Sequence, residues 1–208
     1  MNKLLVFQTD FGLDDGAISA MEGVAYCVDQ SLNIRHLTHN IPQYNIFDAS
    51  YRLYQAINYW PEGTTFVSVV DPGVGSERKS VVARTENNYY IVTPDNGTLT
   101  HIDKFLGIKE VRQIEESTNR LKNSELSYTF HGRDVYAYTG ARLASDTITF
   151  KEVGPEMDLS EIVRLDLFGC KKIENGVLGQ IDILDVRFGS LWTSIPYEDF
   201  KECGFEFG

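Results

Sequence analysis

The sequence predicts an α/β fold, in which a largely parallel sheet is covered by helices on both faces. Short apolar runs alternate with segments of helical periodicity through the first half of the chain, as in strand–helix units. Several of the apolar runs end in loops that combine glycine with an acidic residue or a histidine. From about Leu165 the pattern changes to the alternation typical of antiparallel strands. We therefore expect an α/β domain over residues 1–160 and a second, antiparallel domain over residues 165–208.

The first strand and the first helix follow directly from the pattern. Leu4–Phe7 is a continuous apolar run of the kind found in strands buried on both faces. Residues 17–28 carry apolar side chains at helical spacing, and Asp14 and Asp15 stand before them, where carboxylates favour the positive end of a helix dipole. The same reasoning predicts strands at residues 34–38, 64–70, 80–84, 89–93 and 108–114, and helices at residues 47–60 and 135–144.

The remaining segments are less regular. Residues 115–128 are polar and are expected to form a surface excursion. After residue 165 we expect antiparallel strands at 176–183 and 191–195, and a short helix at 197–203. This second segment is too short to bury a core alone. We expect it to pack on the first domain or on a partner subunit, or to be a domain cut short at Gly208.

Composition excludes several classes of function. The formal net charge of -11 argues against non-specific nucleic-acid binding, which requires a basic surface. The three cysteines and four histidines lack the spacing of a disulfide framework or a zinc site. No segment has the apolar length of a membrane span, and the apolar run within residues 1–6 is too short for a signal peptide. We expect a cytoplasmic protein.

The loop after residues 64–70 is the strongest candidate for chemistry. The apolar run ends at Asp71, and Pro72, which has no N–H donor, stops the strand. The same loop carries a guanidinium at Arg78, seven residues after Asp71. Ligands bind at the carboxyl ends of strands in open α/β sheets. We interpret the loop as one that holds a water molecule for attack on a cationic substrate; the structural alternative is a well-made turn.

Three further loops carry polar side chains at predicted strand or helix ends, at residues 10–12, 94–97 and 130–134. Each has a structural alternative: Asp10 as a turn cap, for example, or His131 as a core histidine. The Asp-Phe-Gly at residues 10–12 also occurs in protein kinases, but the other kinase motifs are missing. Because the carboxyl ends of parallel strands meet at one edge, we expect these loops to converge.

The last of these loops leads into the helix expected at residues 135–144. Asp134 is positioned in the sequence to cap that helix, and Gly132 allows a ligand to approach the backbone closely.

Four motifs occur in order: Thr9-Asp10-Phe11-Gly12 with Asp15, the loop from Asp71 to Arg78, Pro94-Asp95-Asn96-Gly97, and Thr129-Phe130-His131-Gly132-Arg133-Asp134. Together they resemble the S-adenosyl-L-methionine (SAM) hydrolases, or SAM hydroxide adenosyltransferases, which are related to fluorinating and chlorinating enzymes that use SAM. Phe188-Gly189 and Trp192-Thr193 resemble the start of that family's C-terminal domain. The resemblance covers essentially the whole chain.

The resemblance implies an α/β/α sandwich followed by a small antiparallel β-barrel, which we expect to be truncated here. It also implies a homotrimer that binds SAM between the N-terminal domain of one subunit and the C-terminal domain of the next. SAM would be the substrate, with no cofactor and no metal.

The resemblance also implies roles for individual residues. Asp71, Arg78 and His131 match the set that orders the nucleophilic water. Asp10 matches the carboxylate that grips the ribose hydroxyls, Asp15 and Gly132 the region at the methionine end, and Tyr44 an aromatic residue beside the ribose and sulfonium; the other expected substrate-binding residues are Asn96, Phe130, Asp185, Phe188, Ser190 and Trp192. Ser190 stands where the family usually has an asparagine, and His36 where an acidic residue is more usual.

The expected chemistry is a displacement at the ribose C5′ in which a neutral thioether leaves a sulfonium. Since the leaving group is already activated, no metal or acid is needed to expel it. The difficulty is that water is a poor nucleophile, because it gives up a proton only at very high pH. Asp71 would accept a hydrogen bond from that water, Arg78 would pair with Asp71, and His131 would hold the water's other side.

Three alternatives remain open. A halide-using synthase is disfavoured because the carboxylate at position 71 would repel a halide. A SAM- or nucleoside-binding module without turnover is motivated by Ser190 and by the short second segment. A metal-dependent phosphoesterase rests only on the acidic loops.

Overall fold

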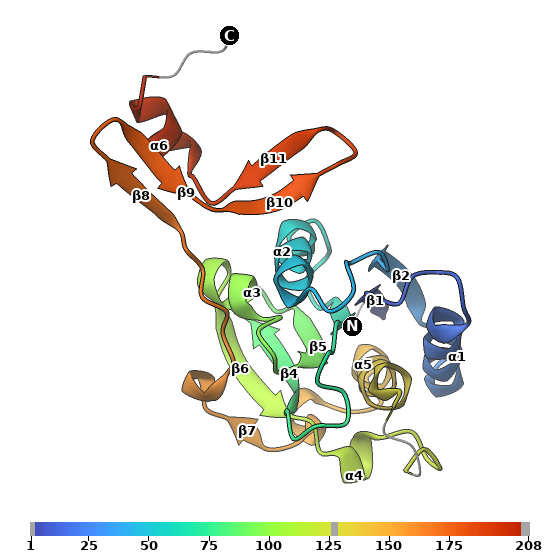
Figure 1. Ribbon diagram of the computed structural model, residues 1–208. Coiled ribbons are helices and arrows are strands. Elements are labelled where there is room, and N and C mark those ends of the chain that lie inside the picture. Colours follow the sequence, from blue (N-terminus) through green and yellow to red (C-terminus); the bar gives the residue numbers. More distant parts are fainter. Residues whose placement is uncertain (1–2, 126–128, 205–208) are drawn as a thin grey trace. The chain divides into compact units, whose positions relative to one another are not determined.

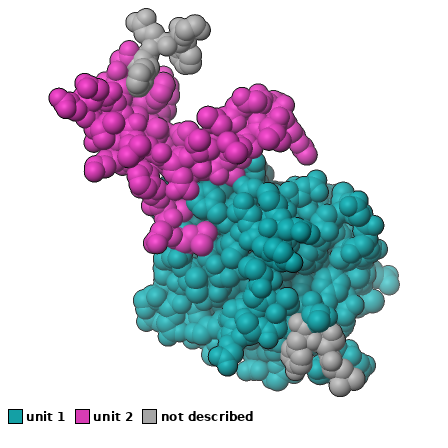
Figure 2. Space-filling view, in the orientation of Figure 1, with its two compact units in different colours: residues 1–164 teal, residues 165–208 magenta. Residues whose placement is uncertain are grey.

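The computed structural model describes residues 3–125 and 129–204. These residues belong to two compact units, Met1–Arg164 and Leu165–Gly208, which are shown in different colours in Figure 2. Each unit is described by itself below. Among the described residues, no helix has both the length and the apolar character that crossing a bilayer requires.

A seven-stranded sheet with the order β2-β1-β3-β5-β4-β6-β7 forms the centre of the first unit (Figure 1). Neighbours along β2-β1-β3-β5 are parallel, whereas β4 is antiparallel to both β5 and β6, so β6 runs in the same direction as β5. The largely parallel α/β sheet expected from the sequence is confirmed. The strands are β1 (Leu4–Thr9), β2 (Asn33–Thr38), β3 (Thr65–Val69), β4 (Ser80–Thr85), β5 (Tyr90–Pro94), β6 (Ile108–Gln113) and β7 (Glu156–Met157).

Helices cover both faces of this sheet (Figure 1). One face carries α1 (Ala17–Val28), the π-helical turn η1 (Gly132–Ala137) and α5 (Tyr138–Ala144). The other carries α2 (Ile46–Ile57) and α3 (Thr100–Phe105). Three shorter helices lie in connections: α4 (Glu116–Asn119), η2 (Phe150–Val153) and η3 (Leu159–Glu161).

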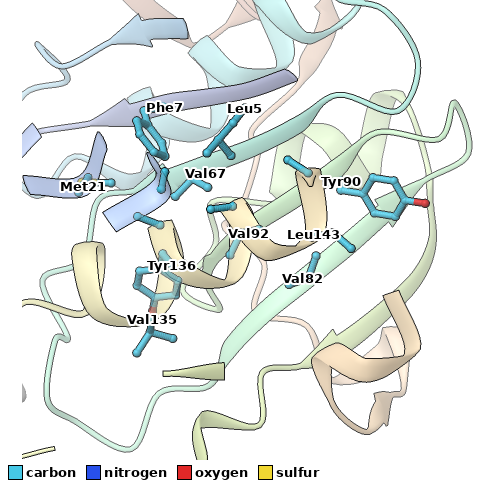
Figure 3. Close-up of a cluster of buried hydrophobic side chains, with 14 of the residues drawn as sticks. Leu5, Phe7, Met21, Val67, Val82, Tyr90, Val92, Val135, Tyr136 and Leu143 are labelled. Carbon is cyan, nitrogen blue, oxygen red and sulfur yellow. The ribbon is translucent and has the colours of Figure 1, made fainter. Parts of the chain in front are cut away.

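The strand sequences explain this three-layer arrangement, because successive side chains of a strand point to opposite faces. Leu5 and Phe7 of β1 belong to the core under α1 and α5, while Val6 between them belongs to the core under α2. All three side chains are fully buried. Figure 3 shows Leu5 and Phe7 with Val67 and Val92 of the neighbouring strands, beside Tyr136 and Leu143 of the covering helices.

Several sequence-based boundaries need correction. The helix expected at 47–60 ends at Ile57, before the proline, and the helix α3 between β5 and β6 was not expected. The helix expected at 135–144 begins three residues earlier, as η1. Asp134 is therefore inside that helix, fully buried and paired with Arg133, and the expectation that it caps the helix is wrong.

The second unit consists of two antiparallel hairpins and one helix. The single strand expected at 176–183 is divided between β9 and β10, and β8 precedes it. The elements are β8 (Cys170–Ile173), β9 (Gly176–Gly179), β10 (Ile181–Asp185), β11 (Ser190–Thr193) and α6 (Tyr197–Glu202). The small antiparallel sheets agree with the expected strand type; a β-barrel and its truncation stay predictions.

Candidate active site

A cavity of about 200 Å³ opens where the segments after β1 and β3 meet the start of η1. These are the carboxyl ends of two adjacent parallel strands, where α/β proteins bind ligands. Apolar and polar side chains both line the cavity: Asp10, Phe11, Gln43, Tyr44, Val69, Asp71, Val74, Thr129, Phe130, His131 and Gly132.

Asp71 and Arg78 form a two-point ion pair at one wall of this cavity. The Arg78 Nε donates to Asp71 Oδ1 at 2.8 Å, and Nη2 donates to Asp71 Oδ2. Both side chains are nearly buried, with 5% and 10% of their surfaces exposed. The fork geometry fixes the orientation of the carboxylate as well as its charge environment.

Arg78 is itself fixed from three other directions. Its Nη1 donates to Ser80 Oγ at 3.0 Å, its Nη2 also lies 3.0 Å from His131 Nδ1, and its guanidinium lies over the buried Tyr136 ring at 5.5 Å from the centroid. Burial disfavours the charged form of Arg78, but hydrogen bonding to Asp71 and nearby negative groups outweigh it, so the pKa of Arg78 lies above its ordinary value. Arg78 is a permanent, immobilised cation.

His131 joins this pair at the start of η1 and is only 5% exposed. The structure thus brings together Asp71, Arg78 and His131 from a loop and a helix that are far apart in the sequence. Burial lowers the pKa of His131 below its ordinary value, and the adjacent Arg78 and Arg120 guanidiniums act in the same direction. The imidazole is therefore neutral at neutral pH.

Arg120 is a neighbour of His131 that sequence reasoning missed. Its Nη1 lies 3.4 Å from His131 Nε2, and it pairs with Glu116 Oε2 at 2.8 Å. The segment 115–128 was expected to be a surface excursion, which is wrong for Asn119, Arg120 and Ser124, all at least nine-tenths buried; residues 126–128 lie outside the described part of the chain. The spacing of Glu116 and Arg120, four residues apart, was the available signal.

Asp10 and Tyr44 form a second wall of the cavity. The backbone N–H of Tyr44 donates to Asp10 Oδ2 at 2.8 Å, which ties the loop after β2 to the end of β1. Tyr44 has a positive φ of 63°, a strained value for a residue with a side chain, and its ring is exposed. An exposed aromatic ring beside a buried carboxylate is a suitable surface for a ribose.

Gly132 allows two aromatic rings to meet beside the cavity. A Cβ at this position would lie 3.0 Å from the Phe11 ring and 3.2 Å from the Phe130 ring. The two rings pack edge to face, 5.9 Å apart between centroids. Glycine at 132 therefore allows these apolar rings to approach the backbone directly after His131.

A series of linked polar side chains connects the end of β1 to α1. Thr9 Oγ1 lies 2.9 Å from His39 Nδ1, His39 Nε2 lies 2.7 Å from His36 Nδ1, and His36 Nε2 pairs with Glu22 at 2.8 Å. Burial and the charge of His36 lower the pKa of His39 to about 4. Since His36 pairs with an acidic residue of α1, the histidine at this position is part of a connected polar network.

We expect His39 and His101, both buried, to make the protein less stable in mild acid. Burial also lowers the pKa of His101 to about 4, with a contribution from Lys104. Below the unfolded-state pKa of about 6.5 these histidines are protonated in the unfolded chain but stay neutral in the folded chain. The free energy of unfolding therefore falls as pH falls from about 6.5 to 4. Each histidine contributes on the order of 1–3 kcal/mol to this loss.

Urea unfolding at several pH values between 7.5 and 4.5 checks this expectation. The matched variant is His101→Asn, which keeps a polar atom near Ser50, the partner of His101 Nδ1 at 2.8 Å, but cannot be protonated. Its stability is expected to depend less steeply on pH than that of the native protein. Parallel curves for the two proteins would contradict the assignment to His101.

The remaining residues expected to bind substrate lie elsewhere. Asp15 is exposed and accepts a hydrogen bond from the Ala17 N–H at the start of α1, and Asn96 uses its carboxamide to bond the Val70 carbonyl and Thr98. Neither lines the cavity. Four others belong to the β10–β11 hairpin of the second unit: Asp185, Phe188, Ser190 and Trp192. Within that hairpin Trp192 Nε1 donates to Asp185 Oδ2 at 3.3 Å.

Within residues 3–125 and 129–204 no three histidine, cysteine, aspartate or glutamate side chains cluster so that they could hold a metal ion.

Comparison with known proteins identifies the family. Residues 5–154, most of the chain, match the model of the SAM hydroxide adenosyltransferase N-terminal domain. The chain belongs to the SAM hydroxide adenosyltransferase family. The family resemblance predicted from the four ordered motifs is confirmed.

One relative of this chain is a Methanocaldococcus jannaschii protein named (R)-S-adenosyl-L-methionine hydrolase. It is 41% identical over 200 residues, which cover 94% of this chain and 68% of the relative. A fluorinase of an Actinoplanes species is 25% identical, over 98% of this chain and 75% of the relative. In three dimensions, an uncharacterized conserved protein from Thermotoga maritima matches with a TM-score of 0.89 and 33% identity, over 98% of this chain and 76% of that structure.

Proposed function

We propose that this protein hydrolyses SAM to adenosine and L-methionine. The observation that carries the proposal is the Asp71–Arg78–His131 set at the wall of the cavity, in a chain that is 41% identical to a protein named SAM hydrolase. SAM is a sulfonium cation, and a carboxylate with a neutral imidazole offers such a cation a favourable setting.

The reaction balances without any co-reactant other than water. The water oxygen forms a bond to the ribose C5′, the C5′–S bond breaks, and its electron pair stays on sulfur as the neutral thioether of methionine. One water proton leaves to the solvent, with Asp71 as the first acceptor. Arg78 holds Asp71 by two hydrogen bonds, so the acceptor is already oriented when the water arrives.

Most of the rate acceleration in this proposal comes from positioning the water and the substrate. An ordinary carboxylate is too weak a base to deprotonate water fully, and partial transfer as the C–O bond forms is sufficient because the leaving group is activated. Correct placement of reacting groups is worth up to roughly 7–11 kcal/mol. Asp10, beside the exposed Tyr44 ring, is proposed to bind the ribose hydroxyls, and the Phe11 and Phe130 rings to limit water at the reacting carbon.

Incubation of the protein with SAM in water enriched in ¹⁸O tests the proposal. Adenosine is expected to form with one ¹⁸O at its 5′-oxygen, and methionine without label, in the presence of EDTA as in its absence. His131→Ala is expected to lose this activity. No adenosine above the protein-free control would overturn the proposal, and calorimetric SAM binding without product would favour a binding module instead.

The halide-using alternative has a direct test in the same assay. Asp71 lines the cavity with its carboxylate nearly buried, and such a charge opposes a halide at that place. Adding chloride or fluoride is therefore expected to leave adenosine as the product. Halide-dependent formation of a 5′-halo-5′-deoxyadenosine would overturn hydrolysis as the main reaction.

The proposal also includes the adenine side of the site and the assembly. A cavity of about 200 Å³ is smaller than the roughly 300–1,000 Å³ typical of pockets for ligands of this size. We propose that the β10–β11 hairpin of another subunit, with Asp185, Phe188, Ser190 and Trp192, completes it in a homotrimer. Analytical ultracentrifugation tests the trimer, and cell fractionation tests the cytoplasmic location expected from the sequence.

A further inference from the structure

His131 lies between two guanidiniums, one at each ring nitrogen. Arg78 Nη2 is 3.0 Å from Nδ1, and Arg120 Nη1 is 3.4 Å from Nε2. A guanidinium can only donate, and a neutral imidazole accepts at one nitrogen, whereas an imidazolium accepts at neither. Protonation of His131 would therefore remove its ability to accept from Arg78 and would place a third cation between two others.

Arg120 is held in place by groups that do not line the cavity. Its Nη1 pairs with Glu116, and its Nε donates to Ser124 Oγ at 3.1 Å. Arg120 is only 9% exposed, and neither it nor Glu116 lines the cavity. Arg120 therefore reaches the cavity through its contact with His131, which lines it.

The charged groups that face His131 come from two parts of the fold. Asp71 and Arg78 approach from the loop between β3 and β4, and Glu116 and Arg120 from α4 and the residue after it. They form two ion pairs, one on each side of the ring. Removing one charge of a pair leaves the other uncompensated, so the two members of the Glu116–Arg120 pair must act on His131 with opposite sign.

We propose that Arg120 is a positioning residue that keeps His131 neutral and its ring fixed for the hydrolytic reaction, and that Glu116 holds Arg120 in place and offsets part of its charge. The inference rests on the proposed function for its catalytic meaning, but its effect on His131 is a property of the protein without substrate. A neutral His131 avoids repulsion of the sulfonium and keeps the lone pair that accepts from Arg78.

The first test measures the protonation of His131 by ¹H NMR titration of the four histidines in the substrate-free protein. In Arg120→Met the midpoint of His131 is expected to move to higher pH, because a nearby cation is lost. In Glu116→Gln it is expected to move to lower pH, because the anion that offsets Arg120 is lost. Lys122→Met, which removes an exposed cation from the same segment, is the matched control and is expected to change nothing.

The opposite signs separate an electrostatic role from a structural one, since general loosening of the site would move both midpoints the same way. An unchanged midpoint in Arg120→Met, or shifts of equal sign in the two variants, would overturn the inference. Glu116 has an exposed side chain fraction of 35%, so Glu116→Gln keeps the test available even where Arg120→Met folds poorly.

The second test follows adenosine formation from SAM across pH. Arg120→Met is expected to lose activity on the acid side of the profile of kcat/KM and to approach the native rate at higher pH, where His131 is neutral again. Arg120→Lys, which restores the positive charge, is expected to recover part of the acid-side activity. A deficit that is equal at all pH values would overturn the inference, whereas absence of adenosine from the native protein would overturn the proposed function and leave the NMR result to decide the role of Arg120.

Discussion

Asp71→Asn is expected to lower kcat for adenosine formation by about 10²–10⁴-fold. Asparagine has nearly the same shape as aspartate, so the loop geometry is kept while the negative charge is lost. The amide is a poor acceptor for a proton from water. In the native protein Arg78 donates to both carboxylate oxygens of Asp71, and in the variant one of these donors would face the NH₂ group, which cannot accept. Steady-state kinetics by chromatography of adenosine measure the effect.

Glu77→Gln is the matched control for this prediction. Glu77 lies on the same loop and is exposed, so the substitution removes one negative charge without touching the Asp71–Arg78 pair. Its kcat is expected to equal that of the native protein. Equal losses in both variants would show that the net charge of the loop, rather than the carboxylate at position 71, determines the rate.

The largest expected effect on stability is that of Gly154→Ala. Gly154 connects η2 to β7 and has a φ of 152°. A Cβ there would lie 2.1 Å from the Gln113 carbonyl oxygen and 2.9 Å from the Glu115 nitrogen. Both are backbone atoms, at the end of β6 and just after it. Backbone cannot move aside as a side chain can, so we expect a loss of about 2–4 kcal/mol in the free energy of unfolding.

Gly63→Ala separates the two causes of that loss. Gly63 also has a positive φ, 79°, but a Cβ there would have no atom within 4 Å. Only the conformational cost then applies, about 1–2 kcal/mol. Urea unfolding of both variants gives the comparison, and equal losses would contradict the steric argument for Gly154.

Much of the fold was predictable because its signals are local. The run Leu4–Phe7 and the helical spacing over Ala17–Val28 each depend on side chains a few positions apart, and both elements formed as expected. The failures occurred where tertiary contacts override local character. The sequence around Asn119 and Arg120 predicts polar surface, yet both residues are buried because their polar atoms find partners. Asn119 donates to the distant Val153 carbonyl, and Arg120 bonds Glu116 and Ser124 and lies against His131.

The sequence predicts which residues at the strand ends could form the site, but it predicts less well how their side chains are oriented. Asp10 and Asp71 follow adjacent parallel strands, so their convergence on one cavity could be inferred from topology. Asn96 follows a strand in the same way but uses its carboxamide to tie loops together. A sequence pattern places a side chain at an edge of the sheet but does not say which way it points.

The sequence by itself determined the strand–helix order, the acidic and glycine-bearing loops at the strand ends, and the family, because these depend on residue type and spacing along the chain. Only the tertiary structure decided that Arg78, besides pairing with Asp71, also contacts His131, and that the Glu116–Arg120 pair lies against the other side of the imidazole. The physical reason is that the charge state of His131 depends on groups within a few ångströms in space, and those groups come from segments that no local pattern connects.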